Sequence, residues 1–344
     1  MYKKIFMGIA AVAALTLVSC SSDDLNSLSD NSSKNEAISF DGYWGRSAVS
    51  VNGSRGSVID KAEDLQNVPE GFGVFGNYSS TDGTTPTYGK NWFDNQPVTY
   101  KTSAWTYNPV KYWLPQGHID FLAYAPYDSN QELKENSKLD FTVSSTIANQ
   151  KDLLWANATN QTKTDKPVTF TFNHALAKIG YTVKTNVVGT GGTTITLNKI
   201  TLAGSATDPT TGAFYTKGTI DLSKGNDATD LWTKQDGKQY FTWFNGSQSL
   251  TSTSESNPET DYLFVIPQNF STGTDELYVI VDYTINYNTG AAATMKSTVS
   301  SKLTKNFEQG KAYKINLSIG LTPIEFDADV TGWKNTEDKD VYWN

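Results

Sequence analysis

The chain has 344 residues, a length that suits two domains of moderate size. Aromatic residues make up 12% of it, which excludes an intrinsically disordered protein, because so many large apolar side chains can build a core. The formal net charge of −8 argues against a protein that binds nucleic acid. One cysteine and two histidines exclude an intramolecular disulfide and leave few ligands for a cysteine-rich or multi-histidine metal site.

The first 19 residues have the pattern of a lipoprotein signal peptide. Lys3 and Lys4 precede the apolar run Ile5–Val18, which is too short to span a membrane. The run ends in the sequence Leu-Val-Ser-Cys at residues 17–20. This sequence resembles a bacterial lipobox, in which the cysteine after the cleavage site carries the lipid. We therefore predict lipidation at Cys20, the only thiol of the chain; the alternative is a chance cysteine behind an ordinary signal peptide.

Residues 20–36 form a polar segment rich in Ser, Asp and Asn, a composition typical of a flexible tether. The run Ser-Ser-Asp-Asp at residues 21–24 resembles a surface-export signal of lipoproteins in some Gram-negative anaerobes, and a plain solvated tether is the alternative. These features predict a precursor that is held in the outer membrane by lipid on Cys20 and exposed at the cell surface.

From residue 37 onward the chain predicts β-structure. Segments of four to nine residues rich in Val, Ile, Thr and aromatic residues alternate with clusters of Gly, Asn, Asp and Pro. Between Tyr313 and Leu321 every second residue is apolar, which indicates a strand with one buried face. Only Ala62–Gln66 suggests a helical turn. The clearest strands are residues 73–78, 119–124, 168–172, 195–202, 262–267, 277–287 and 312–321.

Many short strands separated by turns predict an all-β protein built of antiparallel β-sandwiches. The polar stretch from Ala156 to Pro167 divides the chain into two halves of similar size. We place the boundary there, which gives an N-terminal sandwich at residues 37–165 and a C-terminal sandwich at residues 166–344. The boundary is soft, because strands can cross between sandwiches.

The sequence shows no catalytic motif. A Gly-x-Ser-x-Gly elbow is absent, and the glycine cluster Gly189–Gly192 fits a hairpin turn better than a phosphate loop. His174 fits a structural role within a strand, and the acidic turn Asp227–Asp230 lacks the spacing of a calcium loop. We predict no catalytic residue, no metal and no cofactor, hence no enzyme. A glycosidase is the enzymatic alternative, because such enzymes need only a pair of carboxylates and the chain has 36 Asp and Glu residues.

A second alternative is a surface lipoprotein that binds glycans and does not polymerise. Its sugars would stack on exposed tryptophan rings, and four tryptophans are candidates: Trp105, Trp113, Trp232 and Trp243. In β-rich chains, however, aromatic side chains more often belong to the core.

Several motifs in a fixed order resemble the fimbrillin-like pilins. The segment Trp105–Pro115 (WTYNPVKYWLP) leads into Ile119–Pro126 (IDFLAYAP), similar to the family pattern of a W-x-Y-x-P-x-x-Y-W-P segment followed by a D-F-x-A-Y-x-P strand. Further matches are residues 152–156 (DLLWA), 172–179 (FNHALAKI), 262–268 (YLFVIPQ) and 310–314 (GKAYK).

This resemblance implies two transthyretin-like β-sandwich domains in tandem. It also implies a structural subunit of an adhesive surface fimbrium, made from a lipoprotein precursor that a protease trims and that strand exchange joins to other fimbrial subunits. The partners are then copies of this chain or accessory pilins, with a receptor that the motifs do not identify. A tip or anchor position in the fimbrium is the alternative to a shaft position, because these subunits share the motifs.

Only two arginines occur in the chain, Arg46 and Arg55. An arginine-specific protease could therefore cut only there. Precursors of the fimbrillin-like pilins, which this chain resembles, are cut after such an arginine. The bond between Arg55 and Gly56 matches the family position better, and the bond between Arg46 and Ser47 is its rival. The alternative is that both are ordinary surface residues of a chain that prefers lysine.

The two ends of the chain share a short pattern. Residues 38–42 read Ile-Ser-Phe-Asp-Gly and residues 324–328 read Ile-Glu-Phe-Asp-Ala, so each places Ile and Phe on one face of a strand. We predict that the C-terminal segment is a donor strand that fills the groove left by residues 37–45 of another subunit. Pairing within its own domain is the alternative, and Asp327 and Asp329 would then lie on a solvated face. The donor residues are Ile324, Phe326, Ala328 and Val330.

Replacement of the only thiol tests the predicted lipidation. Cys20→Ala should abolish labelling by a fatty-acid analogue in cells, because lipid transfer needs the thiol, and the protein should leave the membrane fraction. Labelling that persists in this variant would refute the prediction.

Overall fold

Strands make up nearly all of the regular structure, which confirms the predicted all-β fold. The helical segments are α1 (Ala62–Gln66), at the predicted helical turn, and the short 3-10 helix η2 (Ile147–Asn149). Within the described part of the chain, no helix has the length and apolar character needed to cross a membrane. The computed structural model describes residues 37–44, 59, 62–81, 85–187, 192–225, 228, 230–253, 255–256, 261–289, 291–321 and 325–332.

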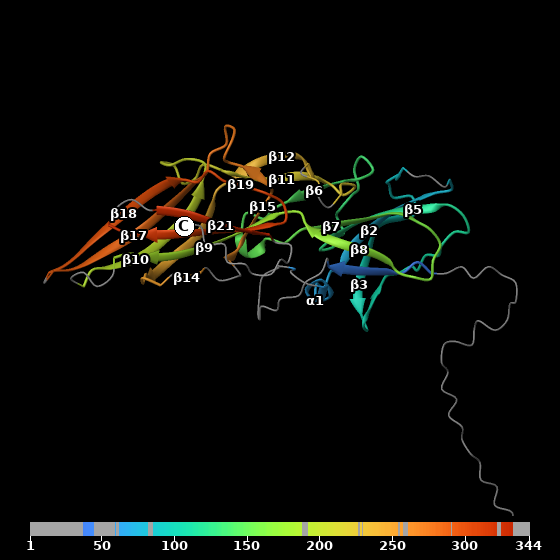
Figure 1. Ribbon diagram of the computed structural model, residues 1–344, viewed down its shortest axis with the longest axis horizontal. Coiled ribbons are helices and arrows are strands. Elements are labelled where there is room, and N and C mark those ends of the chain that lie inside the picture. Colours follow the sequence, from blue (N-terminus) through green and yellow to red (C-terminus); the bar gives the residue numbers. More distant parts are fainter. Residues whose placement is uncertain are drawn as a thin grey trace, which may run out of the picture. The chain divides into compact units, whose positions relative to one another are not determined.

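A seven-stranded sheet is built from the first half of the chain (Figure 1). Its first two strands in spatial order run parallel, and all other neighbours in it are antiparallel. The order is β1 (Phe40–Trp44), β8 (Val168–His174), β7 (Leu154–Gln161), β5 (His118–Ala125), β2 (Phe72–Ser79), β3 (Phe93–Lys101) and β4 (Ala104–Thr106).

The central strand β5 is buried along its whole length because both faces of the sheet are covered. Ile119 and Phe121 point into a core on one face, which we call the N-terminal core. Leu122 and Tyr124 point into a second cluster on the other face, which we call the middle core. Successive side chains of a strand alternate between faces, so one strand serves two cores.

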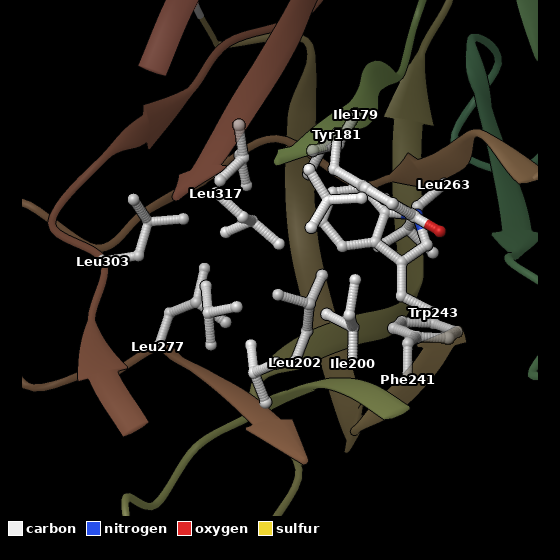
Figure 2. Close-up of a cluster of buried hydrophobic side chains, with 14 of the residues drawn as sticks. Ile179, Tyr181, Ile200, Leu202, Phe241, Trp243, Leu263, Leu277, Leu303 and Leu317 are labelled. Carbon is white, nitrogen blue, oxygen red and sulfur yellow. The ribbon is translucent and has the colours of Figure 1, made fainter. Parts of the chain in front are cut away.

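Two further sheets enclose the C-terminal core, a cluster of buried residues between positions 177 and 319 (Figure 2). In β20 the buried positions Tyr313, Ile315, Leu317 and Ile319 alternate with less buried ones, which confirms the predicted strand. One sheet has the order β13 (Phe241–Ser249), β10 (Thr194–Ala203), β17 (Tyr278–Thr289) and β18 (Ala291–Lys302). The other has the order β14 (Glu255–Ser256), β9 (Ala177–Thr185), β20 (Lys311–Ile319) and β21 (Glu325–Gly332), with β15 (Leu263–Val265) also on β9.

Strands from both halves of the chain form a smaller sheet over the middle core. Its order is β12 (Trp232–Gln239), β11 (Phe214–Asp221) and β6 (Lys138–Thr142). Thus β6 precedes residue 165 yet pairs with β11, as expected when strands cross between sandwiches. The division into two tandem domains at residue 165 stays a prediction. A two-stranded ladder of β16 (Gln268–Asn269) and β19 (Asn306–Phe307) completes the described strands.

Candidate functional site

The first strand, β1, lies at one end of the strand order of the seven-stranded sheet. It pairs with β8 on one side, with Phe40 opposite Val168 and Trp44 opposite Phe172. It also contacts β4, the strand at the far end of the same sheet, where Trp105 lies against the position of Gly42. In Figure 1, β1 is the blue strand beside β8. The strand therefore fills a slot between the two ends of the sheet, and we call this slot the β1 slot.

Hydrogen bonds to neighbouring segments hold the residues just before β1. The amide of Ile38 donates to the carbonyl oxygen of Lys111 at 2.8 Å, and the amide of Val168 donates to the carbonyl oxygen of Ser39 at 2.8 Å. The hydroxyl of Tyr107 donates to the carbonyl oxygen of Ile38 at 2.7 Å. Burial raises the pKa of Tyr107, so this hydroxyl keeps its proton at neutral pH and stays a donor.

Ile38, two residues before β1, and Phe40, its first residue, are anchored in the N-terminal core. Ile38 is 1% exposed and Phe40 is 4% exposed. The ring of Phe40 contacts four other rings with centroid separations between 5.3 and 5.7 Å, in edge, tilted and stacked arrangements. These rings belong to Phe93, Tyr107, Phe121 and Phe170. Ile38 and Phe40 therefore anchor this part of the chain in the N-terminal core.

The loop that borders the slot is itself held by Lys111. Its ammonium group lies 4.9 Å from the centre of the Phe93 ring and 5.6 Å from that of Trp92, and it donates to the carbonyl oxygen of Trp92. Such cation–π contacts stabilise a partly buried ammonium group. The same loop thus keeps Tyr107 and the Lys111 carbonyl in place when they bind Ile38.

The chain after the predicted cleavage sites is anchored at Ile59. Its side chain is buried, and its amide donates to Oδ2 of Asp152 at 3.3 Å. The same carboxylate oxygen lies 2.9 Å from Nδ1 of His174. Cys20, Arg46, Ser47, Arg55, Gly56 and Ile324 lie outside the described residues.

The last described strand, β21, lies at the edge of a different sheet from β1. It pairs antiparallel with β20 of the same chain. This is the pairing expected from the alternative to donation, in which the C-terminal segment stays in its own domain. Directly opposite residues of such a pair share a face. The positions of Phe326, Ala328 and Val330 therefore share the face of Leu317, Ile315 and Tyr313, which are buried.

The outer edge of β21 has no neighbouring strand among the described elements. Val330 is 44% exposed although it lies on the apolar face. On the opposite face Asp329 is exposed and accepts a hydrogen bond from Nδ2 of Asn316 at 2.9 Å, as predicted for a solvated face. The strand is thus bound along one side only.

Both histidines lie beside buried aspartates. Nε2 of His118 is 3.3 Å from Oδ2 of Asp120, and His174 contacts Asp152 as described above. Asp120 also accepts hydrogen bonds from the amides of Thr87 and Asn160, both at 2.7 Å. These surroundings are those of structural groups that tie loops to strands. No cluster of three or more possible metal ligands occurs among the described residues.

The four tryptophans of the glycan-binding alternative belong to packed clusters. Trp113 and Trp243 are buried, and Figure 2 shows Trp243 beside Tyr181 in the C-terminal core. Trp105 is half-buried against Phe72, and half-buried Trp232 donates from Nε1 to the Ala175 carbonyl at 2.8 Å. A pocket of about 750 Å³ adjoins Trp243. None of the four offers a fully exposed ring on which a sugar could stack.

Comparisons with known proteins agree with one another. The family model described as fimbrillin-like matches residues 61–333. The fimbrium subunit Fim1C of Phocaeicola vulgatus is 24% identical to this chain, over 97% of the chain and 97% of that protein. The crystal structure of a fimbrial protein from Bacteroides vulgatus matches with a TM-score of 0.66 and 21% identity, over 87% of this chain and 100% of that one. At this identity the structural match shows a common fold.

The anchoring of β1 by Phe40 can be measured in the full-length chain. Phe40→Ala should lower the free energy of unfolding by about 3–5 kcal/mol, since it removes a ring packed against four others. Asp41→Ala is the matched control on the exposed face of the same strand, and it should change the value by no more than about 0.5 kcal/mol. Urea unfolding followed by tryptophan fluorescence gives both numbers. Equal losses in the two variants would contradict this role of Phe40.

Proposed function

The chain belongs to the fimbrillin-like family, and from this premise we propose that it is a structural pilin that is exported as a lipoprotein, trimmed near its N-terminus and polymerised by donor-strand exchange. Membership in a family of fimbrial subunits places the protein in surface fimbriae and confirms the prediction that it is not an enzyme. The observation that supports trimming and strand exchange is the β1 slot. The strand that fills it, β1, precedes the region matched by the family model, residues 61–333.

Lipid on Cys20 is the first part of the proposal. The lipobox ends at the single thiol of the chain, and several acyl chains on one cysteine would hold the precursor almost permanently in a membrane, since each buried CH₂ contributes about 0.8 kcal/mol. Before trimming, the precursor would thus remain anchored in the outer membrane with β1 bound in its slot. The tether at residues 20–36 would allow the folded part to extend away from the membrane surface.

Trimming after an arginine is the second part. Both arginines lie between the end of β1 at Trp44 and the anchored residue Ile59. A cut at either position would separate β1 from the rest of the chain and leave Ile59 bound to Asp152. The new N-terminus would therefore begin close to a fixed point of the fold.

Loss of β1 would expose an apolar slot and the backbone edge of β8. Burial of each large apolar side chain contributes about 1.5–3 kcal/mol, and each aromatic pair adds about 0.5–1.5 kcal/mol. The summed contributions from burial of Ile38 and Phe40 and from the four ring contacts of Phe40 are comparable to the net stability of a domain, about 5–15 kcal/mol. A strand from another chain that restores these contacts would bind by β-augmentation.

The segment that begins at Ile324 is the proposed donor. It repeats the Ile-x-Phe-Asp pattern of residues 38–41, and among the described strands β21 pairs with β20 alone. A donor at the C-terminus and a slot at the N-terminus give a head-to-tail contact, and such contacts build filaments when they do not close into a ring. The partners are copies of this chain or accessory pilins.

The two arginines can be tested separately and together. Arg55→Ala should block trimming if Arg55 is cut, and Arg46→Ala should do so if Arg46 is cut. The double variant should stay a full-length surface lipoprotein that forms no polymer. N-terminal sequencing of protein from cell-surface fimbriae identifies the cut. Polymers that retain residues 20–45 would refute trimming.

A charge in the donor strand tests strand exchange. Phe326→Asp should give a trimmed monomer that adds to no further subunit, because the aromatic pocket of Phe40 cannot solvate a carboxylate. Its own slot remains intact, so it should still accept a wild-type donor and shorten wild-type polymers when mixed with them. Asp327→Ala, on the opposite face, should polymerise normally. Wild-type polymer lengths from Phe326→Asp, measured by light scattering and electron microscopy, would contradict the donor assignment.

A further inference from the structure

The buried face of β1 has a pattern of two large residues followed by a small one. Ile38, Phe40 and Gly42 are all buried, whereas Asp41 between them is exposed. Because side chains alternate along a strand, these three positions enter the slot at three successive sites. The first two sites hold large side chains, and the third holds only hydrogen.

The third site is narrow because two side chains lie against it. A Cβ atom added at Gly42 would lie 3.3 Å from Cδ2 of Leu65 and 3.5 Å from Cε2 and Cζ2 of Trp105. A methyl group fits there after a shift of a few tenths of an ångström, whereas any larger side chain would overlap the wall.

Leu65 and Trp105, which form this wall, are packed against other side chains and remain in the subunit after trimming. Leu65 is 1% exposed within α1. The ring of Trp105 lies 4.8 Å from that of Phe72 and 5.2 Å from that of Tyr100. All four residues follow Arg55 in the sequence, so they stay with the trimmed subunit whichever arginine is cut.

We propose that Leu65 and Trp105 form a size filter that sets both the register and the direction of the incoming strand. This inference rests on the proposed strand exchange. In the selected arrangement Ile324, Phe326 and Ala328 occupy the sites of Ile38, Phe40 and Gly42, and the strand runs parallel to β8 as β1 does.

Each alternative arrangement that keeps Phe326 at one of the three sites puts a side chain larger than a methyl group at the narrow site. Antiparallel insertion centred on Phe326 places Ile324 there. A shift of two residues along the slot places either Phe326 or Val330 there. Shifts of one residue would turn Glu325 and Asp327 into the core. Ala328 is the one residue of the pattern that the filter admits.

Cysteine cross-linking reads the register directly. Asp41 is paired with Thr169 of β8, and both are exposed, so neighbouring strands bring these positions close enough for a disulfide. Trimmed subunits lack Cys20, which leaves no competing thiol. Asp327→Cys in the donor should link to Thr169→Cys in the acceptor, seen as covalent dimers on a non-reducing gel. Glu325→Cys reports antiparallel insertion or the shift that places Phe326 at the narrow site, Asp329→Cys reports the opposite shift, and neither should link.

Assembly rates test the filter itself. Ala328→Leu should slow polymerisation of trimmed subunits at least tenfold, whereas Ala328→Gly should assemble at the wild-type rate. Asp327→Leu adds a similar volume on the exposed face and serves as the control. Leu65→Ala in the acceptor should restore assembly with an Ala328→Leu donor, and Trp105→Phe replaces it as the rescuing variant if Leu65→Ala does not fold.

The outcomes separate the filter from the proposed function. Wild-type rates for Ala328→Leu, or a dominant link from Glu325→Cys or Asp329→Cys, would overturn the filter while strand exchange by this segment stands. Polymers that form without a link from any of the three cysteines would overturn the donor assignment and the filter with it. Wild-type trimmed subunits that never polymerise would refute the proposed function.

Discussion

The packing of Phe40 among four aromatic rings is the interaction on which the proposed life cycle of this subunit depends. Its strand is short, lies at the end of the sheet order and, among the described strands, pairs with β8 alone. Its backbone pairs with β8 along all five residues, and such pairing does not depend on the side-chain sequence, whereas the burial of Ile38 and Phe40 does. A binding energy concentrated in Ile38 and Phe40 can be supplied equally well by another segment that presents the same two side chains. This is the physical property that distinguishes an exchangeable strand from an ordinary one.

The division of the apolar side chains among three cores limits the damage that loss of β1 would cause. Ile38 and Phe40 belong to the N-terminal core, and no side chain that the structure describes between residues 37 and 42 belongs to the middle or C-terminal core. The middle core is closed by β6, β11 and β12, and Asn157 ties β7 to the loop after β11 through hydrogen bonds to two carbonyl oxygens at 2.9 Å. Under the proposal, a trimmed subunit would keep these two cores and lack part of one.

The sequence predicted what depends on local pattern and missed what depends on distant contacts. Period-two alternation predicted β20, and the repeated Ile-x-Phe motif predicted that Ile38 and Phe40 share one face of an N-terminal strand. The pairing of β6 with β11 was not predictable, because strand partners far apart in sequence are chosen by packing rather than by propensity. The narrow site at Gly42 was also missed, since Leu65 and Trp105 come from a separate helix and strand. The contact of His118 with Asp120 could have been found, because residues two apart on a strand share a face.

Covalent connection explains why a cut would be needed before strand exchange. A strand on the same chain competes for its slot at an effective concentration in the millimolar range, as a short linker provides. A donor strand on a separate subunit at micromolar concentration would face this competition with nearly identical contacts, since both present Ile and Phe to the same sites. It would lose by roughly a thousandfold, or about 4 kcal/mol. Under the proposal, cleavage between Trp44 and Ile59 would remove this advantage, because the released segment could diffuse away. The proposed size filter at Gly42 would then act on a slot that is open to other strands, which is the stage at which register and direction must be chosen.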